Sequence, residues 1–132
     1  MKPPVETIRI SKQGREQLAK LRRHTGIENW NVLCRWAFCV SMGEKTPPPP
    51  VTQKMDGGVE MTWKVFAGDQ NEIFSALTLM RADKDGFPLN PEGLANYVRA
   101  HLHRGLAYLA SGNKTRSLSD LVKRCINCKV EA

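Results

Sequence analysis

The stretch from Asn29 to Met42, NWNVLCRWAFCVSM, restricts the fold of this chain more than any other. Read as a helix, it places apolar side chains along one face and covers much of the opposite side with further apolar side chains. A helix that is apolar nearly all round must be buried nearly all round, and in a small domain part of that burial is often against another subunit. The candidates for an oligomer interface are Trp30, Leu33, Trp36 and Val40.

The whole sequence predicts one compact, mainly α domain, because 132 residues suffice for one core and are too few for two independent ones. About five helices are expected. They cover residues 12–24, residues 29–42, a segment from Asp69 to the stretch DKDGFPLNP, residues 90–111 and residues 117–127. Ser11 and Asn90 are predicted N-caps, and Gly26 and Gly112 are predicted stops.

Apolar spacing also predicts which faces of the later helices point inward. In the third helix these residues are Ile73, Phe74, Leu77 and Met80. In the longest helix they are Leu94, Val98, Leu102, Leu106 and Leu109, and in the last helix they are Leu118, Leu121, Val122 and Cys125.

Two segments have the alternating pattern of extended chain. VETIRIS near the N-terminus predicts a short β-like segment, and VEMTWKVF at residues 59–66 predicts one strand or extended edge. Between the helices, residues 43–58 contain four consecutive prolines and a Gly-Gly pair. This composition predicts an extended linker, with a docking site for a proline-reading partner as the alternative.

The charge of the chain indicates a polyanionic partner. The formal net charge is +7 and the pI is about 9.5. Residues 1–45 have a balance of +5, residues 46–96 of −3 and residues 97–130 of +6. Basic protein surface binds nucleic acid by releasing counterions. If the two basic ends meet in the fold, they form one positive face.

A basic stripe is expected on the first helix. Within a sector of about 100° on the helical wheel the sequence places four basic residues around a small one. These residues are Lys12, Arg15, Ala19, Arg22 and Arg23. Such a stripe allows a helix to approach a phosphate backbone closely, although an ordinary solvated face has the same pattern. A second basic cluster consists of Lys114, Arg116, Lys123 and Arg124.

The order of a short strand followed by two helices also fits the outline of a ribbon-helix-helix DNA binder. In such proteins the strand pairs across a dimer and enters the major groove. Under this hypothesis Thr7, Arg9 and Ser11 would contact bases.

The sequence contains no nucleophile elbow, no phosphate-cradling Gly-rich motif and no close carboxylate pair on a helix face, so we expect no enzymatic activity. Cys125 and Cys128 have zinc-like or redox-like spacing, but Cys34 and Cys39 match the other half of a zinc site poorly. We therefore expect Cys34, Cys39 and Cys125 to be small core residues, with no metal, no cofactor and no structural disulfide. No membrane span or secretory signal is recognisable, which predicts a cytoplasmic protein.

The chain resembles the DndE family of DNA sulfur-modification (phosphorothioation) proteins. The resemblance lies in IRISKQGREQLAKLRRHTGIENWNVLCRWAFCVS, in EMTWKVFAG, and in the closing VRAHLHRGLAYLAS and SLSDLV. It implies membership of a bacterial pathway that replaces a non-bridging phosphate oxygen of DNA with sulfur, in which other proteins perform the sulfur chemistry.

The resemblance further implies a small DNA-binding subunit without activity of its own, which forms tetramers and favours nicked duplex. Backbone contacts would suffice for such binding. The expected partners are therefore double-stranded DNA, further copies of the chain and other proteins of the pathway. The expected DNA-binding residues are Lys12, Arg15, Arg22, Arg23, Lys114 and Arg116. The alternative is an assembly or scaffold protein that contacts protein partners and not DNA.

Overall fold

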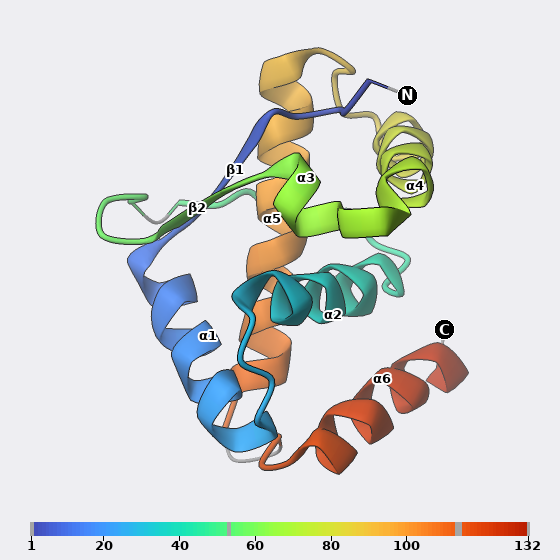
Figure 1. The fold of residues 1–132 in the computed structure, drawn as a ribbon. Coiled ribbons are helices and arrows are strands. Elements are labelled where there is room, and N and C mark those ends of the chain that lie inside the picture. Colours follow the sequence, from blue (N-terminus) through green and yellow to red (C-terminus); the bar gives the residue numbers. More distant parts are fainter. Residues whose placement is uncertain (1, 53, 113–114, 132) are drawn as a thin grey trace.

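The computed structural model describes residues 2–52, 54–112 and 115–131, with only the backbone described for residues 126–131. Its elements in chain order are β1 Thr7–Ile10, α1 Lys12–Thr25, α2 Trp30–Met42, β2 Val59–Thr62, α3 Trp63–Ala67, the 3-10 helix η1 Gly68–Gln70, α4 Asn71–Lys84, α5 Pro91–Ala110 and α6 Leu118–Glu131 (Figure 1). The mainly α architecture and the five expected helices are confirmed. The short α3 was not expected.

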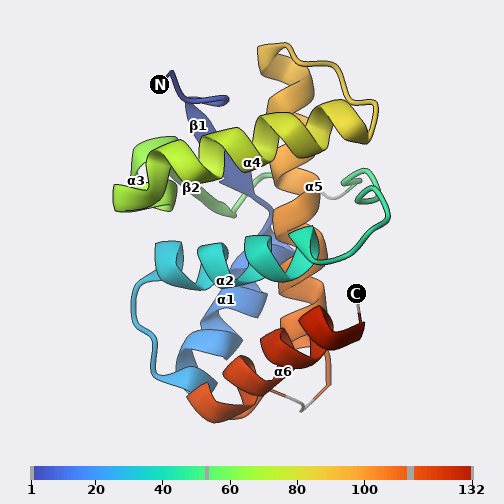
Figure 2. The same ribbon diagram turned by 90° about the vertical axis from the view of Figure 1, so that its right-hand side faces the viewer.

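Helix α5 runs the length of the molecule, and α2 crosses it (Figures 1 and 2). Asn90 caps α5 as predicted, because its side chain accepts a hydrogen bond from the N–H of Gly93. The predicted core face of α5 is confirmed, since Leu94, Val98, Leu102, Leu106 and Leu109 are all buried. Gly105 allows the close crossing: a β-carbon built there would lie 2.9 Å from the Cα of Ala37 and closer still to the carbonyl of that residue.

The two strands pair within the chain. β1 and β2 are antiparallel, with Thr7 opposite Thr62 and Ile10 opposite Val59. The ribbon-helix-helix outline predicts that β1 pairs with a strand of a dimer partner, whereas here β1 pairs with β2 of the same chain. Ser11 is also buried as a helix cap and offers no surface to a base.

The expected strand at residues 59–66 ends early. Thr62 caps α3 by accepting a hydrogen bond from the N–H of Val65, and the chain turns helical so that Trp63 and Phe66 are buried. Trp63 then donates its indole N–H to Asn71 Oδ1 at 2.7 Å, which fixes the start of α4. Asp69, where the sequence predicted this helix to start, lies in η1, and no side chain caps α4.

Helix α4 buries a different face from the one predicted. Phe74 is buried as expected, but its buried neighbours are Ser75, Thr78 and Ala82. Ile73, Leu77 and Met80 are 57%, 45% and 71% exposed. The polar residues tolerate burial because they are hydrogen-bonded within α4: Thr78 donates to the carbonyl of Phe74 at 2.7 Å, and Ser75 to Asn71 Oδ1 at 3.3 Å.

The proline-rich connection after α2 is held by two arginines. Arg104 donates to the carbonyl and hydroxyl of Ser41 and to the carbonyls of Thr46 and Pro47. Arg81 donates to the carbonyls of Met42 and Glu44. These cations satisfy carbonyls at the end of α2 that have no helical partner. None of the helices in the described part of the chain has the length and apolar character to span a bilayer.

Candidate nucleic-acid interface

Helix α1 is held firmly at both ends. Ser11 accepts a hydrogen bond from the N–H of Gly14 at 3.0 Å, and Gly26 ends the helix with φ 79° in the left-handed region. Gly14, Leu18 and Leu21 form its narrow buried side. Both predicted caps are thus confirmed, and the opposite side of α1 is open to solvent.

A buried histidine of α5 fixes the start of α1. Ser11 donates its backbone N–H to His103 Nε2 at 3.1 Å, and its hydroxyl lies 3.0 Å from the same nitrogen. His103 Nδ1 lies 2.8 Å from the carbonyl of Arg99, which only accepts, so Nδ1 carries the proton and Nε2 is the acceptor. Burial lowers the pKa of His103, in keeping with this neutral form.

The predicted basic stripe lies on the surface of α1. Lys12, Arg15, Arg22 and Arg23 are exposed, and Ala19 is half-buried between them. Among the residues that the structure describes, no carboxylate forms an ion pair with any of the four cations. Arg15 donates to the carbonyl of Gly57 at 3.3 Å, a contact at the surface. The four charges are therefore available to an external anion.

Lys20 of α1 binds the end of α5. Its ammonium donates to the carbonyls of Ala110 at 2.9 Å and Gly112 at 2.6 Å. It satisfies carbonyls at the end of α5 and ties the connection between α5 and α6 to α1. Helix α1 and the segment that follows α5 therefore lie together at one end of the molecule, where α6 also packs against α1 (Figure 1).

Only part of the second basic cluster is exposed to an external anion. Arg116 and Lys123 are exposed. Arg124 is half-buried, with its guanidinium 4.3 Å from the ring centre of Tyr108 and a hydrogen bond to Thr115 Oγ1 at 3.1 Å. Lys114 lies outside the described residues.

The four residues predicted to form an oligomer interface do not all lie on the surface. Leu33 and Val40 are 0% and 5% exposed, so both belong to the core of the chain itself. Trp30 and Trp36 are only partly buried. The correction follows from α2 crossing α5 and packing on α3, which covers more of α2 than its isolated pattern indicates.

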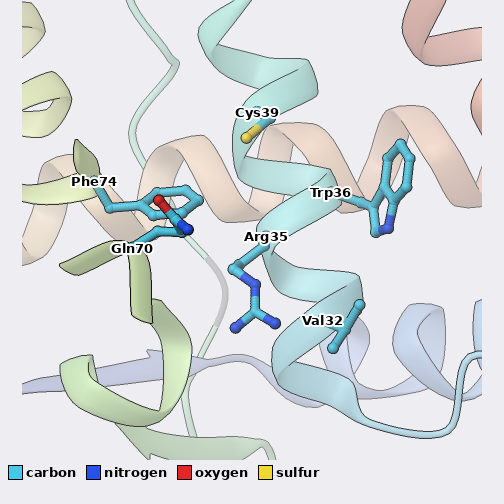
Figure 3. A pocket seen from close by; sticks show the side chains of 6 residues that line it. All are labelled: Val32, Arg35, Trp36, Cys39, Gln70 and Phe74. Carbon is cyan, nitrogen blue, oxygen red and sulfur yellow. The ribbon is translucent and has the colours of Figure 1, made fainter. Parts of the chain in front are cut away.

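An apolar hollow lies beside Trp36. It has a volume of about 360 Å³, and Figure 3 shows Trp36 and Val32 of α2 on one side with Phe74 and Gln70 on the other. The exposed row Ile73, Leu77 and Met80 on α4 adds to the apolar surface of this part of the protein. Sequence analysis found these three residues but assigned them to the core.

The cysteines and histidines whose side chains are described do not gather into a site. Cys34 is buried, and burial raises its thiol pKa to about 12. Cys39 is exposed, contrary to the core position predicted for it, and Cys125 is half-buried. Cys128 lies outside the residues whose side chains are described. Within the described part of the chain, no cluster of three or more His, Cys, Asp or Glu has metal-binding geometry.

His101 belongs to a separate buried network. Its Nδ1 lies 2.8 Å from Ser41 Oγ, which accepts a hydrogen bond from Arg104 at 2.8 Å. Burial, with the charges of Arg104 and Arg81, lowers the pKa of His101 to about 3. The His101 ring is fully buried, and its Nε2 has no hydrogen-bond partner among the described residues.

Two crystal structures are similar to this fold. DndE from Escherichia coli B7A, described as involved in DNA phosphorothioation modification, is 25% identical, with a TM-score of 0.66 over 79% of this chain and 94% of that chain. A glycine-to-lysine double mutant of DndE, described as involved in DNA phosphorothioation, is 24% identical, with a TM-score of 0.64 over 83% and 99% of the two chains. No curated protein matches the sequence.

The family model described as "DNA sulphur modification protein DndE" matches residues 7–117. The match contains β1, α1, α2 and α5, and thus the basic stripe and the helices that hold it. Of the stretch SLSDLV, only the first residue lies inside the match. With most of its length matched, the chain belongs to the DndE family, whose members take part in DNA phosphorothioation.

Proposed function

We propose that this protein is a non-catalytic, cytoplasmic subunit of the bacterial DNA phosphorothioation system that binds double-stranded DNA through its backbone phosphates. The observation that carries the proposal is the stripe of four exposed cations on α1, Lys12, Arg15, Arg22 and Arg23. The stripe extends about 16 Å along the helix axis, enough to follow several phosphates of one duplex.

The chemistry of the stripe suits phosphate. Arginine donates two parallel hydrogen bonds to phosphate oxygens, and the small side chain of Ala19 leaves room for the DNA backbone to approach the helix. Because α1 is capped by Ser11 and Gly26, its cations are held on a rigid element before DNA arrives. The conformational entropy cost of binding is then small.

Two of the three residues predicted to contact bases, Arg9 and Ser11, already have partners or are buried, which favours binding to the DNA backbone. Arg9 forms an ion pair with Glu60 at 3.6 Å, and Ser11 is buried. Phosphate contacts position a protein on DNA without reading its sequence. A protein of this kind discriminates by how easily DNA deforms, and a nick makes duplex easier to bend. We therefore include a preference for nicked duplex in the proposal.

The proposal includes assembly into a homo-oligomer, with a tetramer as the expected state. The observation in its favour is the apolar surface formed by Trp36 at the hollow and by Ile73, Leu77 and Met80 on α4. Exposed apolar patches of this kind mark contacts between proteins. Together with Trp30, these residues replace Leu33 and Val40 as interface candidates.

The test is a binding titration with intact, nicked and single-stranded DNA over a range of salt concentrations. Replacing Arg15, Arg22 and Arg23 with Glu should weaken binding to all duplex sequences. The slope of log K against log salt should become shallower by about 0.9 for each phosphate that the variant no longer neutralises.

A matched control carries the same change of charge elsewhere. Lys2, Lys45 and Lys64 are exposed and lie outside α1, so their replacement with Glu should weaken binding much less. Equal reductions in affinity in the two triple variants would mean that net charge alone determines binding, and unchanged binding in the α1 variant would exclude the stripe as the DNA-binding surface.

A scaffold function is the second candidate, favoured by the same exposed apolar row on α4. The wild-type titration separates the two. A protein that binds pathway proteins tightly and shows no DNA binding at moderate salt would be a scaffold.

A further inference from the structure

We infer that helix α6 is a second DNA-contacting element, which extends the basic surface of α1 beyond the part of the chain that defines the family. This inference rests on the proposed DNA-binding function. It assigns to α6 a ligand, the phosphate backbone of the same duplex, and a contact residue, Lys123.

Helix α6 lies outside the family match. The match ends at Ser117, and α6 begins at the next residue, Leu118. The aligned regions cover 94% and 99% of the two DndE crystal structures but only 79% and 83% of this chain. The alignments with these two structures thus leave part of this chain uncovered, and the family match stops before α6.

The start of α6 packs against the rest of the domain. Leu121 is fully buried. Arg124 is held over the ring of Tyr108 and donates to Thr115 Oγ1. The contacts fix which side of α6 faces solvent.

The exposed side of α6 contains one cation among the described side chains, Lys123, together with Leu118 and Val122, which were predicted to point inward but are 49% and 37% exposed. Lys123 lies two residues after the buried Leu121, about 200° around the helix, and its side chain is exposed. Asp120 is the acidic residue nearby, but its carboxylate accepts the backbone N–H of Arg116 at 3.0 Å. That hydrogen bond engages the acid near the start of α6, where the helix dipole also favours a negative charge.

The position of α6 joins this charge to the stripe. Lys20 holds the carbonyl of Gly112 beside α1, and α6 packs on α1 (Figures 1 and 2). Arg22 and Arg23 lie in the last turn of α1. Because α6 packs against α1, we expect one duplex to contact both helices.

The test compares three full-length variants, Lys123→Glu, Arg22→Glu and Lys64→Glu, by salt-dependent titration of intact duplex. Lys123 and Lys64 are both exposed lysines, and Lys64 on α3 serves as the matched control. We expect Lys123→Glu to weaken binding about tenfold at low salt and to lower the salt slope by about 1. Lys123→Gln should lower the slope as well, with a smaller reduction in affinity.

The outcomes separate this inference from the proposed function. If Arg22→Glu weakens binding and Lys123→Glu behaves like Lys64→Glu, α6 is not a DNA contact, while the proposed function stands. If wild-type protein does not bind duplex at all, both the proposed function and this inference are wrong.

Discussion

A single methyl group at Gly105 should disrupt the crossing of α2 and α5. In Gly105→Ala, the new β-carbon would lie 2.9 Å from the Cα of Ala37, and real β-carbons essentially never approach other heavy atoms closer than 3.0 Å. Carbon atoms pack at about 3.5–4.0 Å, so the contact with the Cα alone would require the two helices to separate by about 0.6 Å, and the still closer carbonyl of Ala37 would require more. The nearest atoms belong to the backbone of Ala37, which has no rotamer that would relieve the contact.

Two opposing terms set the size of the effect. Overpacking of a core costs about 1–3 kcal/mol or more, whereas replacing Gly with Ala inside a helix contributes about 1 kcal/mol of stability. Because the clash is with backbone, we take the upper part of that range and expect a net destabilisation of about 2 kcal/mol. For a domain of this size the melting temperature should fall by about 6–10 °C.

Thermal and urea unfolding followed by circular dichroism would measure this destabilisation. The matched control is Ala107→Gly, the reverse exchange at an exposed position of the same helix, which should cost about 1 kcal/mol through helix propensity alone. If Gly105→Ala unfolds at the same temperature as wild type or higher, the close crossing is not a real constraint on this fold.

Three further predictions concern the contacts that support the candidate interface. Ser11→Ala removes the cap of α1 and should lower stability by about 1 kcal/mol in urea unfolding, whereas a wild-type midpoint would mean that the hydroxyl is dispensable. Burial keeps His101 and His103 neutral in the folded state, with a pKa of about 3 for His101, whereas the unfolded chain protonates below pH 6.5. Stability should therefore be complete above pH 6.5 and fall as the pH drops below it, and a urea midpoint equal at pH 7.5 and pH 5.0 would contradict this. Lys20→Met removes both hydrogen bonds to the end of α5 and should cost about 1 kcal/mol, with faster amide exchange after Ala110; unchanged exchange there would contradict the tie between α1 and α5.

The sequence predicts helices well where local chemistry fixes them. Ser11, Gly26 and Asn90 bound α1 and α5 because each satisfies backbone groups within a few residues of itself. The exposure of the basic stripe follows in the same way, because Leu18 and Leu21 determine which side of α1 is buried.

The features that sequence analysis missed depend on distant contacts. The orientation of α4 is decided by Trp63, which donates to Asn71, and by Phe74, which packs against the rings of Phe38 and Phe66. Apolar periodicity alone contains none of this information. Distant contacts also explain the wrong prediction for Leu33 and Val40. Their spacing on α2 is typical of an interface, but α5 crosses α2 and buries both side chains within the chain.

Lys20 shows the same limit within the site. The helical wheel places Lys20 away from the stripe, but only the end of α5, ninety residues away in sequence, shows where its ammonium is engaged. A basic residue can therefore be assigned to DNA only when its partners in the fold are known.

The two ends of the core differ in the kind of group that holds them. The end of α2 is held by Arg81 and Arg104, whose guanidinium groups stay charged at any pH a cell experiences. The start of α1 is held by His103, which bonds to Ser11 only while it is neutral. Acid should therefore weaken the attachment of β1 and the first turn of α1, and at lower pH the contact of His101 with Ser41 at the crossing of α2 and α5. The helix proposed to meet DNA is thus attached through a group whose hydrogen bond depends on proton concentration.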